Sequence, residues 1–196
     1  LVAFKRVIQE LGKAAVYVSH DLAVVAQMAD RIVVLNGGEV QECGEVDQVL
    51  DAPAHAYTRA LLTASAHREG RATHERARAV RGGADAPLLE IRGLSAGYGR
   101  MDRHGYPAVC VLDDVNLSIA RGNALGVIGE SGSGKTTLAR VVAGLVERAS
   151  GEVLFEGKPL SAQLSGRTAD QYRRIQLVFQ NADTALNPSH TVADIL

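Results

Sequence analysis

The chain has 196 residues, 46% of them hydrophobic, which is enough for one globular domain or two partial ones. Its 21 basic and 22 acidic residues give a formal net charge of -1, so no large field draws it onto nucleic acid or anionic lipid. Two cysteines, Cys43 and Cys110, lack metal-ligand spacing and fit reduced thiols in a cytosolic compartment. No apolar run approaches the ~20 residues that span a bilayer, so we expect any membrane contact to go through a partner.

The first 66 residues have the pattern of an α/β sheet. The chain opens without a Met and already in helical spacing, which we interpret as the interior of a longer protein. The turn at 36–38, Asn-Gly-Gly, requires positive φ angles and indicates a hairpin. The elements expected in this part are a helix at 1–11, a strand at 14–18, a helix at about 21–29, a strand at 31–35 and a return strand at 39–42.

Residues 67–87 differ in composition from both sides of the chain. Arginines recur there beside Gly82 and Gly83, and large apolar side chains are almost absent, which is typical of a linker. The alternative is a solvated helix over residues 73–81, because Ala and Arg are good helix formers. Both interpretations separate one unit at residues 1–66 from another at residues 88–196.

The second unit opens with a strand at 88–94 and a Gly-rich turn. A strand follows in which Val115, Leu117 and Ile119 alternate with polar residues. The run 124–128 is continuously apolar, as expected for a central strand that is covered on both faces.

That apolar run leads directly into a phosphate-binding motif, Gly129-Glu130-Ser131-Gly132-Ser133-Gly134-Lys135-Thr136-Thr137. The glycines allow successive backbone N–H groups to form an anion-binding nest, and the helix that follows adds the positive end of its dipole. Lys135 would supply a mobile charge to the phosphates, and the Thr136 hydroxyl can bind the Mg²⁺ that bridges them. A chance Gly-Ser loop is the alternative, but a strand before the motif and a helix after it are the context that the motif requires.

These residues resemble the ATP-binding cassette (ABC) ATPases, and more narrowly the peptide, opine and nickel importer branch. Residues 88–196 are similar to the first half of a cassette domain, in which 129–137 is the Walker A loop and 175–180 the Q-loop. Residues 1–66 are similar to the last part of another copy, in which His20 matches the switch histidine. The tail at 55–62 resembles that of peptide importers, although those usually have Pro at the position of Ala56.

The resemblance implies a role for each matching residue. Tyr98 would stack on adenine, although Tyr106 is a rival for this role and Tyr98 could also be a turn aromatic. Gln180 would bind and sense Mg²⁺ and couple to the membrane subunit; alternatively, it is an ordinary polar strand end. His20 would sense the γ-phosphate in the parent protein; alternatively, it is a loop or capping histidine. The run 164–167, Leu-Ser-Gly-Arg, is not the signature loop, because it precedes the Q-loop and lacks the expected Gly-Gln.

The family's Walker B acids and signature loops have no counterpart in this sequence, so the resemblance assigns ATP hydrolysis to the parent protein. ATP with Mg²⁺ is the expected cofactor, and two permease subunits and a solute-binding protein are the expected partners at the cytoplasmic face of the membrane. Non-transport cassette proteins of ribosomes or DNA repair are one alternative. A nucleotide-binding module without turnover is another.

The final expectation concerns how the two units pack. Strands 14–18 and 124–128 would each have an open edge, and they come from homologous domains. We therefore expect a hybrid α/β sheet in which these strands run parallel and side by side, with His20 facing the phosphate loop. Residues 176–179 would then be poorly anchored, because the Walker B strand is missing.

Overall fold

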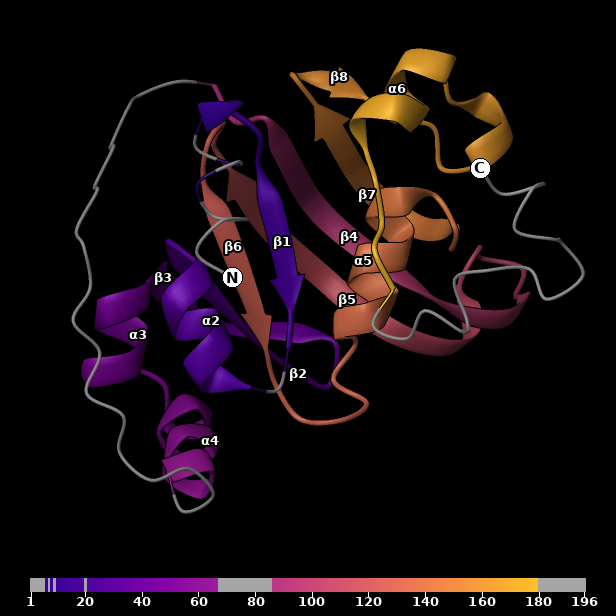
Figure 1. Cartoon of the computed structure of the whole chain (residues 1–196). Helices are drawn as coiled ribbons and strands as arrows, with labels where there is room; N and C mark the ends of the chain where they lie inside the picture. The colour runs from indigo at the N-terminus through magenta and orange to yellow at the C-terminus, as the bar shows by residue number, and fades with distance from the viewer. Residues whose placement is uncertain (1–5, 7, 9, 20, 67–85, 180–196) are drawn as a thin grey trace, which may run out of the picture.

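The computed structural model describes residues 6, 8, 10–19, 21–66 and 86–179 of the chain (Figure 1). We call residues 10–66 the N-terminal segment and residues 86–179 the C-terminal segment. Among the described residues the elements are β1 (Ala15–Val18), α2 (Leu22–Met28), β2 (Arg31–Asn36), β3 (Glu39–Glu45), α3 (Val46–Asp51), α4 (Ala56–Ala66), β4 (Leu89–Met101), β5 (Pro107–Ile119), β6 (Ala124–Ile128), α5 (Lys135–Ala143), β7 (Arg148–Phe155), β8 (Lys158–Pro159), the 3-10 turn η1 (Leu164–Gly166) and α6 (Ala169–Arg174).

The first sheet has the strand order β1-β6-β2-β3 and is built from both segments. Strand β6 of the C-terminal segment runs parallel to β1 on one side and to β2 on the other. Ala15 is the register partner of Ala124, which confirms the expected parallel pairing of these two apolar strands. His20, which was expected to face the phosphate loop, lies outside the described residues.

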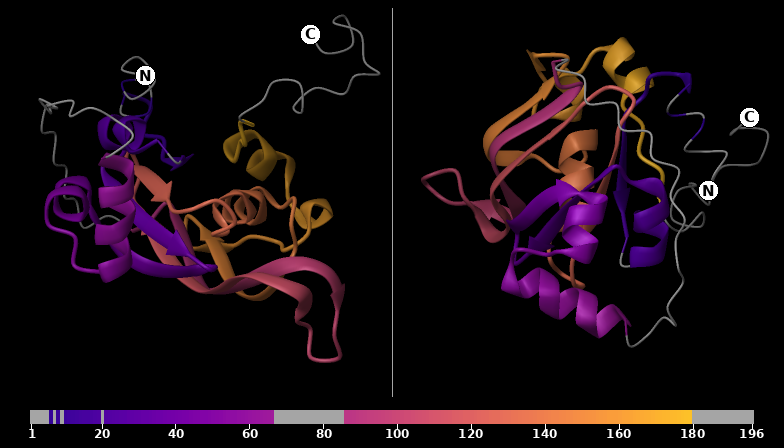
Figure 2. Two further views of the ribbon diagram at one scale, coloured as in Figure 1. Left: turned by 90° about the horizontal axis from the view of Figure 1, so that it is seen from below. Right: turned by 90° about the vertical axis from the view of Figure 1, so that its left-hand side faces the viewer.

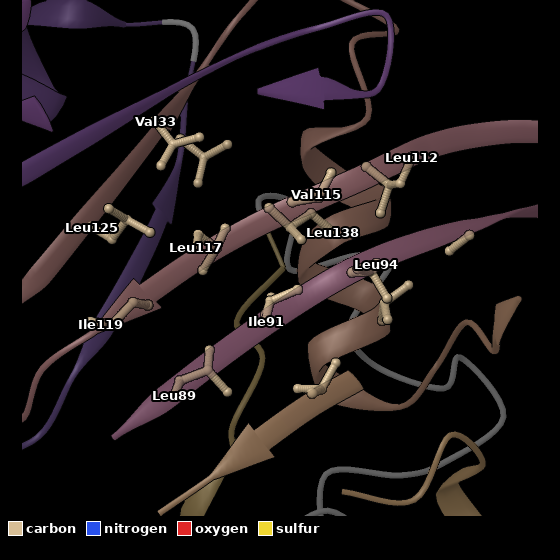
Figure 3. Packing of buried hydrophobic residues seen from close by; sticks show 14 of the residues in the cluster. Val33, Leu89, Ile91, Leu94, Leu112, Val115, Leu117, Ile119, Leu125 and Leu138 are labelled. Atoms are coloured by element: carbon tan, nitrogen blue, oxygen red, sulfur yellow. The ribbon is translucent and has the colours of Figure 1, made fainter. Parts of the chain in front are cut away.

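Strand β6 is buried on both faces, as its continuous apolar sequence predicts. Leu125 and Val127 belong to one core cluster, which Val33 of β2 shares and which extends to β4, β5 and α5 (Figure 3). Ile128 belongs to a second cluster formed with α2 and α3. A Cβ at Gly126 would lie 2.3 Å from Cγ1 of Val25, so α2 packs directly on the backbone of β6.

The second sheet has the order β5-β4-β7-β8, is antiparallel and comes entirely from the C-terminal segment. The predicted Gly-rich turn after residue 94 is wrong, because β4 continues to Met101. The strands β4 and β5 approach closely there: a Cβ at Gly97 would lie 1.9 Å from the carbonyl oxygen of Val109, so glycine lets the pairing continue. The long β4–β5 hairpin projects from the body of the molecule (Figure 2, left).

The helices divide between the two faces of the first sheet. α5 packs against β1 and also against β4 and β5, so it lies between the two sheets (Figure 1). α2, α3 and α4 supply the residues of the second cluster, together with β2 and Ile128 of β6. This confirms the predicted α/β class, with the loop between β6 and α5 at the carboxyl end of a central parallel strand.

Residues 176–179 follow α6 and form neither helix nor strand. Val178 is 87% exposed and Phe179 is 38% exposed, in agreement with the expected poor anchoring of this stretch. Among the described helices, none has the length and apolar character that a bilayer crossing requires.

Candidate nucleotide-binding site

The loop from Gly129 to Gly134 joins β6 to α5, and two of its glycines are required by close packing. A Cβ at Gly129 would lie 2.2 Å from the carbonyl oxygen of Leu35, which belongs to the neighbouring strand β2. Gly134 has φ 100° and caps α5, and a Cβ there would lie 2.8 Å from Cδ2 of Leu112. Larger residues at these two positions would therefore force the loop off the sheet.

Lys135 turns its side chain back into the loop. Its Nζ donates to the carbonyl oxygens of Gly129 at 2.9 Å and Glu130 at 2.6 Å, and to Oγ of Ser133 at 3.3 Å. Burial lowers the pKa of this ammonium group. The positive charge is therefore held inside the loop by weak acceptors, which an anionic phosphate would replace favourably.

The remaining motif residues lie at the loop and at the start of α5. Glu130, Ser131, Gly132 and Thr136 are exposed, whereas Ser133 and Thr137 are buried. A Cβ at Gly132 would contact nothing within 4 Å, so the loop is open to solvent at that point. α5 spans nine residues and begins at this loop, and no side chain caps its N-terminus, where the positive end of the helix dipole lies.

The N-terminal segment supports the loop from the β2–β3 turn. The backbone N–H of Gly38 donates to the carbonyl oxygen of Ser133 at 3.2 Å, and the N–H of Asp113 donates to the carbonyl oxygen of Gly38 at 3.0 Å. A Cβ at Gly38 would lie 2.1 Å from the carbonyl oxygen of Val111. This turn is thus wedged between the phosphate loop and β5. The sequence indicated the turn but gave no signal of this contact.

A second support comes from α4. The backbone N–H of Glu130 donates to the Tyr57 hydroxyl at 3.4 Å. Tyr57 belongs to the tail at 55–62, which the sequence associated only with a family branch. No local pattern relates this tyrosine to a loop 73 residues away.

Tyr98 lies on β4 and reaches the first turns of α5. Its hydroxyl is 3.2 Å from Oγ1 of Thr137, and Nη1 of Arg140 donates to it at 3.4 Å. Burial tends to raise the pKa of Tyr98, but the hydrogen bonds from Thr137 and Arg140 and the charge of Arg140 outweigh it and lower the pKa overall. The ring remains 40% exposed.

The rival aromatic, Tyr106, lies near the tip of the β4–β5 hairpin, where its backbone N–H donates to Asp102 at 2.9 Å. The structure therefore brings Tyr98 to α5 and places Tyr106 at the hairpin. Sequence reasoning did not single out Arg140, although its position three residues after Thr137 put both on one helix face.

Two predicted site residues, His20 and Gln180, lie outside the described residues. The rejected signature-like run has a structural role instead. Arg167 is buried and donates to the carbonyl oxygens of Val142 at 2.7 Å and Val141 at 3.4 Å. It therefore holds the carboxyl end of α5, the helix that carries the phosphate loop.

The donor set fits a polyphosphate: an ammonium group inside the loop, a helix N-terminus and an exposed Thr136 hydroxyl. Among the described residues no three His, Cys, Asp or Glu side chains form a metal-binding group. The exposed Thr136 hydroxyl could serve as one protein ligand to Mg²⁺ that arrives with phosphate oxygens.

Comparison with known proteins agrees with this geometry. The family model described as ABC transporter matches residues 112–195. The glutathione import ATP-binding protein GsiA of Salmonella paratyphi A is 31% identical over 212 residues, covering 94% of this chain and 33% of that protein. GsiA of Escherichia coli K12 is 31% identical over 210 residues, covering 95% of this chain and 33% of its own length.

The chain thus spans about a third of the length of these relatives. The alignments nevertheless cover nearly all of its own residues, including those of both segments. Residues 112–195 thus match the ABC transporter family model, and nearly the whole chain is similar in sequence to the glutathione import ATP-binding proteins.

Proposed function

We propose that this chain is part of the ATP-binding subunit of an ABC importer and binds ATP with Mg²⁺ at residues 129–137. The observation that supports this most strongly is the position of Lys135, whose ammonium group lies inside a loop between a central parallel strand and a helix N-terminus. Residues 1–66 would be the end of one cassette domain, 67–87 a linker, and 88–196 the start of a second domain.

Each site residue has a distinct part in this proposal. Lys135 and the loop N–H groups bind the phosphates, and Tyr98 offers its exposed ring to the base. Thr136 and Gln180 bind Mg²⁺, which offsets phosphate charge when it is bound. In the whole protein, His20 senses the γ-phosphate of the other nucleotide site.

The whole protein would couple ATP hydrolysis to uptake of peptides or related small solutes. The glutathione import proteins that it resembles support this solute class, because glutathione is a small peptide. Its partners would be two permease subunits and a solute-binding protein. The chain would lie at the cytoplasmic face of the membrane and contact the membrane only through the permease.

Titration with a fluorescent ATP analogue tests the proposal. Lys135→Ala should weaken binding at least tenfold, which corresponds to about 1.4 kcal/mol, because the loop loses its charge. Lys158→Ala is a matched control, since Lys158 is an exposed lysine on β8. Equal binding by wild type and Lys135→Ala would show that this loop is not the site.

Phosphate release in the same samples measures turnover. It should stay at background, because no residue pair of the Walker B type positions the attacking water. Turnover that disappears in Lys135→Ala would contradict a binding site without hydrolysis in this chain.

A further inference from the structure

The contact between Tyr98 and α5 joins the two ends of the proposed nucleotide site. Tyr98 belongs to β4, whereas Thr137 and Arg140 lie one turn apart on the helix that begins at the phosphate loop. Both side chains reach the Tyr98 hydroxyl, at 3.2 and 3.4 Å. One helix therefore carries the phosphate loop at its first residue and holds the aromatic ring through its next turns.

The backbone around Tyr98 does not fix the ring by itself. Tyr98 lies between Gly97 and Gly99, and Gly99 has φ 92°. The register of β4 against β5 shifts on both sides of Tyr98. Because the ladder is irregular around Tyr98, the contacts of its hydroxyl help to set the position of the ring.

Arg140 is suited to hold that end. Its guanidinium donates to the hydroxyl, and among the described residues no carboxylate lies within 4.0 Å of it. A planar, permanently charged donor fixes the direction of its hydrogen bond better than a flexible ammonium group does. Thr137, which is buried, contacts the same hydroxyl through its Oγ1 atom at 3.2 Å.

We propose that Arg140 is a positioning residue for nucleotide recognition, which holds the exposed ring of Tyr98 in place to receive the base. This inference rests on the proposed function, because it requires the phosphates to bind at Lys135. Arg140 acts through Tyr98 and contributes to binding of the base, not of the phosphates.

The test separates these two parts of the ligand. N-methylanthraniloyl-ATP is bound to the whole chain and displaced by ATP or by inorganic tripolyphosphate, which has no base. Arg140→Met keeps the length of the side chain and removes its donors. It should weaken displacement by ATP about threefold and leave displacement by tripolyphosphate unchanged.

Variants of Tyr98 set the scale. Tyr98→Ala should weaken ATP binding about tenfold, as expected for a lost base–aromatic contact. Tyr98→Phe should weaken ATP binding as much as Arg140→Met does, because the ring remains while its hydroxyl is lost. Combining Tyr98→Phe with Arg140→Met should weaken ATP no further than either change alone. Arg140→Lys should restore part of the loss, and Arg173→Met, an exposed arginine on α6, is the matched control.

Spectrophotometric titration of the tyrosines checks the contact between Arg140 and Tyr98 directly, while the difference between ATP and tripolyphosphate separates positioning of the ring from a purely structural role. The signal of Tyr98 is obtained as wild type minus Tyr98→Phe, and its pKa should rise in Arg140→Met, because the positive charge that favours the phenolate is gone. The same difference measured with Arg173→Met should be unchanged.

Three outcomes would overturn the inference. Equal losses for ATP and tripolyphosphate in Arg140→Met would make Arg140 a phosphate contact or a support of the loop. No loss for either ligand would show that it positions nothing, and an unaffected Tyr98→Ala would show that the base lies elsewhere. Each is distinct from failure of the proposed function itself, in which Lys135→Ala would leave both ligands bound.

Discussion

The two sheets differ in where their strands come from. The antiparallel sheet β5-β4-β7-β8 uses only the C-terminal segment, and two of its three strand pairs, β4 with β5 and β7 with β8, join strands that are consecutive in the chain. In the mixed sheet, β6 pairs with β1 and β2, which both belong to the N-terminal segment. The strand that leads into the phosphate loop therefore takes both its neighbours from the other segment.

The strand pairs of the antiparallel sheet therefore form within its own segment, whereas the phosphate loop depends on contacts with the N-terminal segment. All strand pairings of the antiparallel sheet lie within residues 86–179, two of them as hairpins and one, β4 with β7, across β5, β6 and α5. The phosphate loop, in contrast, rests on Leu35 of β2, Gly38 of the β2–β3 turn and Tyr57 of α4. Changes in the N-terminal segment should therefore alter nucleotide binding even though the motif lies in the C-terminal segment.

The largest effect is expected from Gly38→Ala. A Cβ there would overlap the carbonyl oxygen of Val111 at 2.1 Å, and the residue has φ 87°. Left-handed strain and the backbone overlap together should lower the free energy of unfolding by about 3 kcal/mol. ATP affinity should fall as well, because the turn no longer supports Ser133.

Gly37→Ala is the matched control for this change. Gly37 also has positive φ, 56°, but a Cβ there meets nothing within 4 Å. It should cost about 1 kcal/mol from backbone strain alone and leave ATP affinity unchanged. Urea denaturation and nucleotide titration of both variants measure the difference, and equal effects would mean that the wedge at Gly38 does not support the loop.

A smaller effect is expected where α2 of the N-terminal segment packs on β6. In Gly126→Ala the new Cβ meets Cγ1 of Val25 at 2.3 Å, and we expect a loss of about 2 kcal/mol from overpacking. Val25→Ala alone removes buried methyl groups and should cost about 2 kcal/mol.

The double variant isolates the contact between the segments. Val25→Ala removes the overlap with the new methyl group, and that methyl fills part of the cavity left by Val25, so the double variant should be at least about 1 kcal/mol more stable than the sum of the two losses predicts. Unfolding of all four proteins in urea completes the cycle. Simple additivity would indicate that Val25 and Gly126 are not in contact.

The smallest effect is expected within the N-terminal segment, at Glu42. Burial tends to raise the pKa of this carboxyl, but hydrogen bonds from the N–H groups of Ala54 and His55 and from the Gln48 side chain help to lower it below its ordinary value of 4.5. Glu42→Gln should reduce stability at neutral pH by about 1–2 kcal/mol, because charged acceptors bind these donors more strongly.

The pH dependence of this loss follows from the direction of the shift. A carboxyl whose pKa is lower in the folded than in the unfolded state stabilises the protein fully at pH values above its unfolded pKa. It loses this contribution as the pH falls toward its folded pKa. The difference between wild type and Glu42→Gln should be constant above about pH 5.5 and shrink below about pH 4.5. A difference that grows on acidification would contradict the lowered pKa.

The local features of the fold and of the phosphate loop could be predicted from sequence. The phosphate loop, the strand at 124–128 and the alternation of Val115, Leu117 and Ile119 each follow from residues close together in the chain. The turn predicted after residue 94 was wrong because Gly97 was interpreted as a turn signal. In the structure it allows close approach of β5 instead.

The long-range supports could not be predicted in the same way. Nothing near Arg140, Tyr57 or Gly38 in the sequence indicates the residues that they contact. Arg140 contacts Tyr98, 42 residues away, and Tyr57 contacts Glu130, 73 residues away. Gly38 contacts Ser133, 95 residues away. The pairing of β1 with β6 was predictable only because two apolar strands of similar origin each required a neighbour.

In the hybrid sheet β6 pairs with β1 of the same chain, and an engineered disulfide can trap that pairing. Ala15 and Ala124 are register partners, so Ala15→Cys with Ala124→Cys places two small side chains on adjacent strands. In a background with Cys43→Ser and Cys110→Ser, mild oxidation should link the two peptides within the monomer, as found by mass spectrometry. Ala15→Cys with Ala108→Cys, an exposed position on β5, should remain unlinked. Free thiols at positions 15 and 124, or links found only in dimers, would contradict the hybrid sheet.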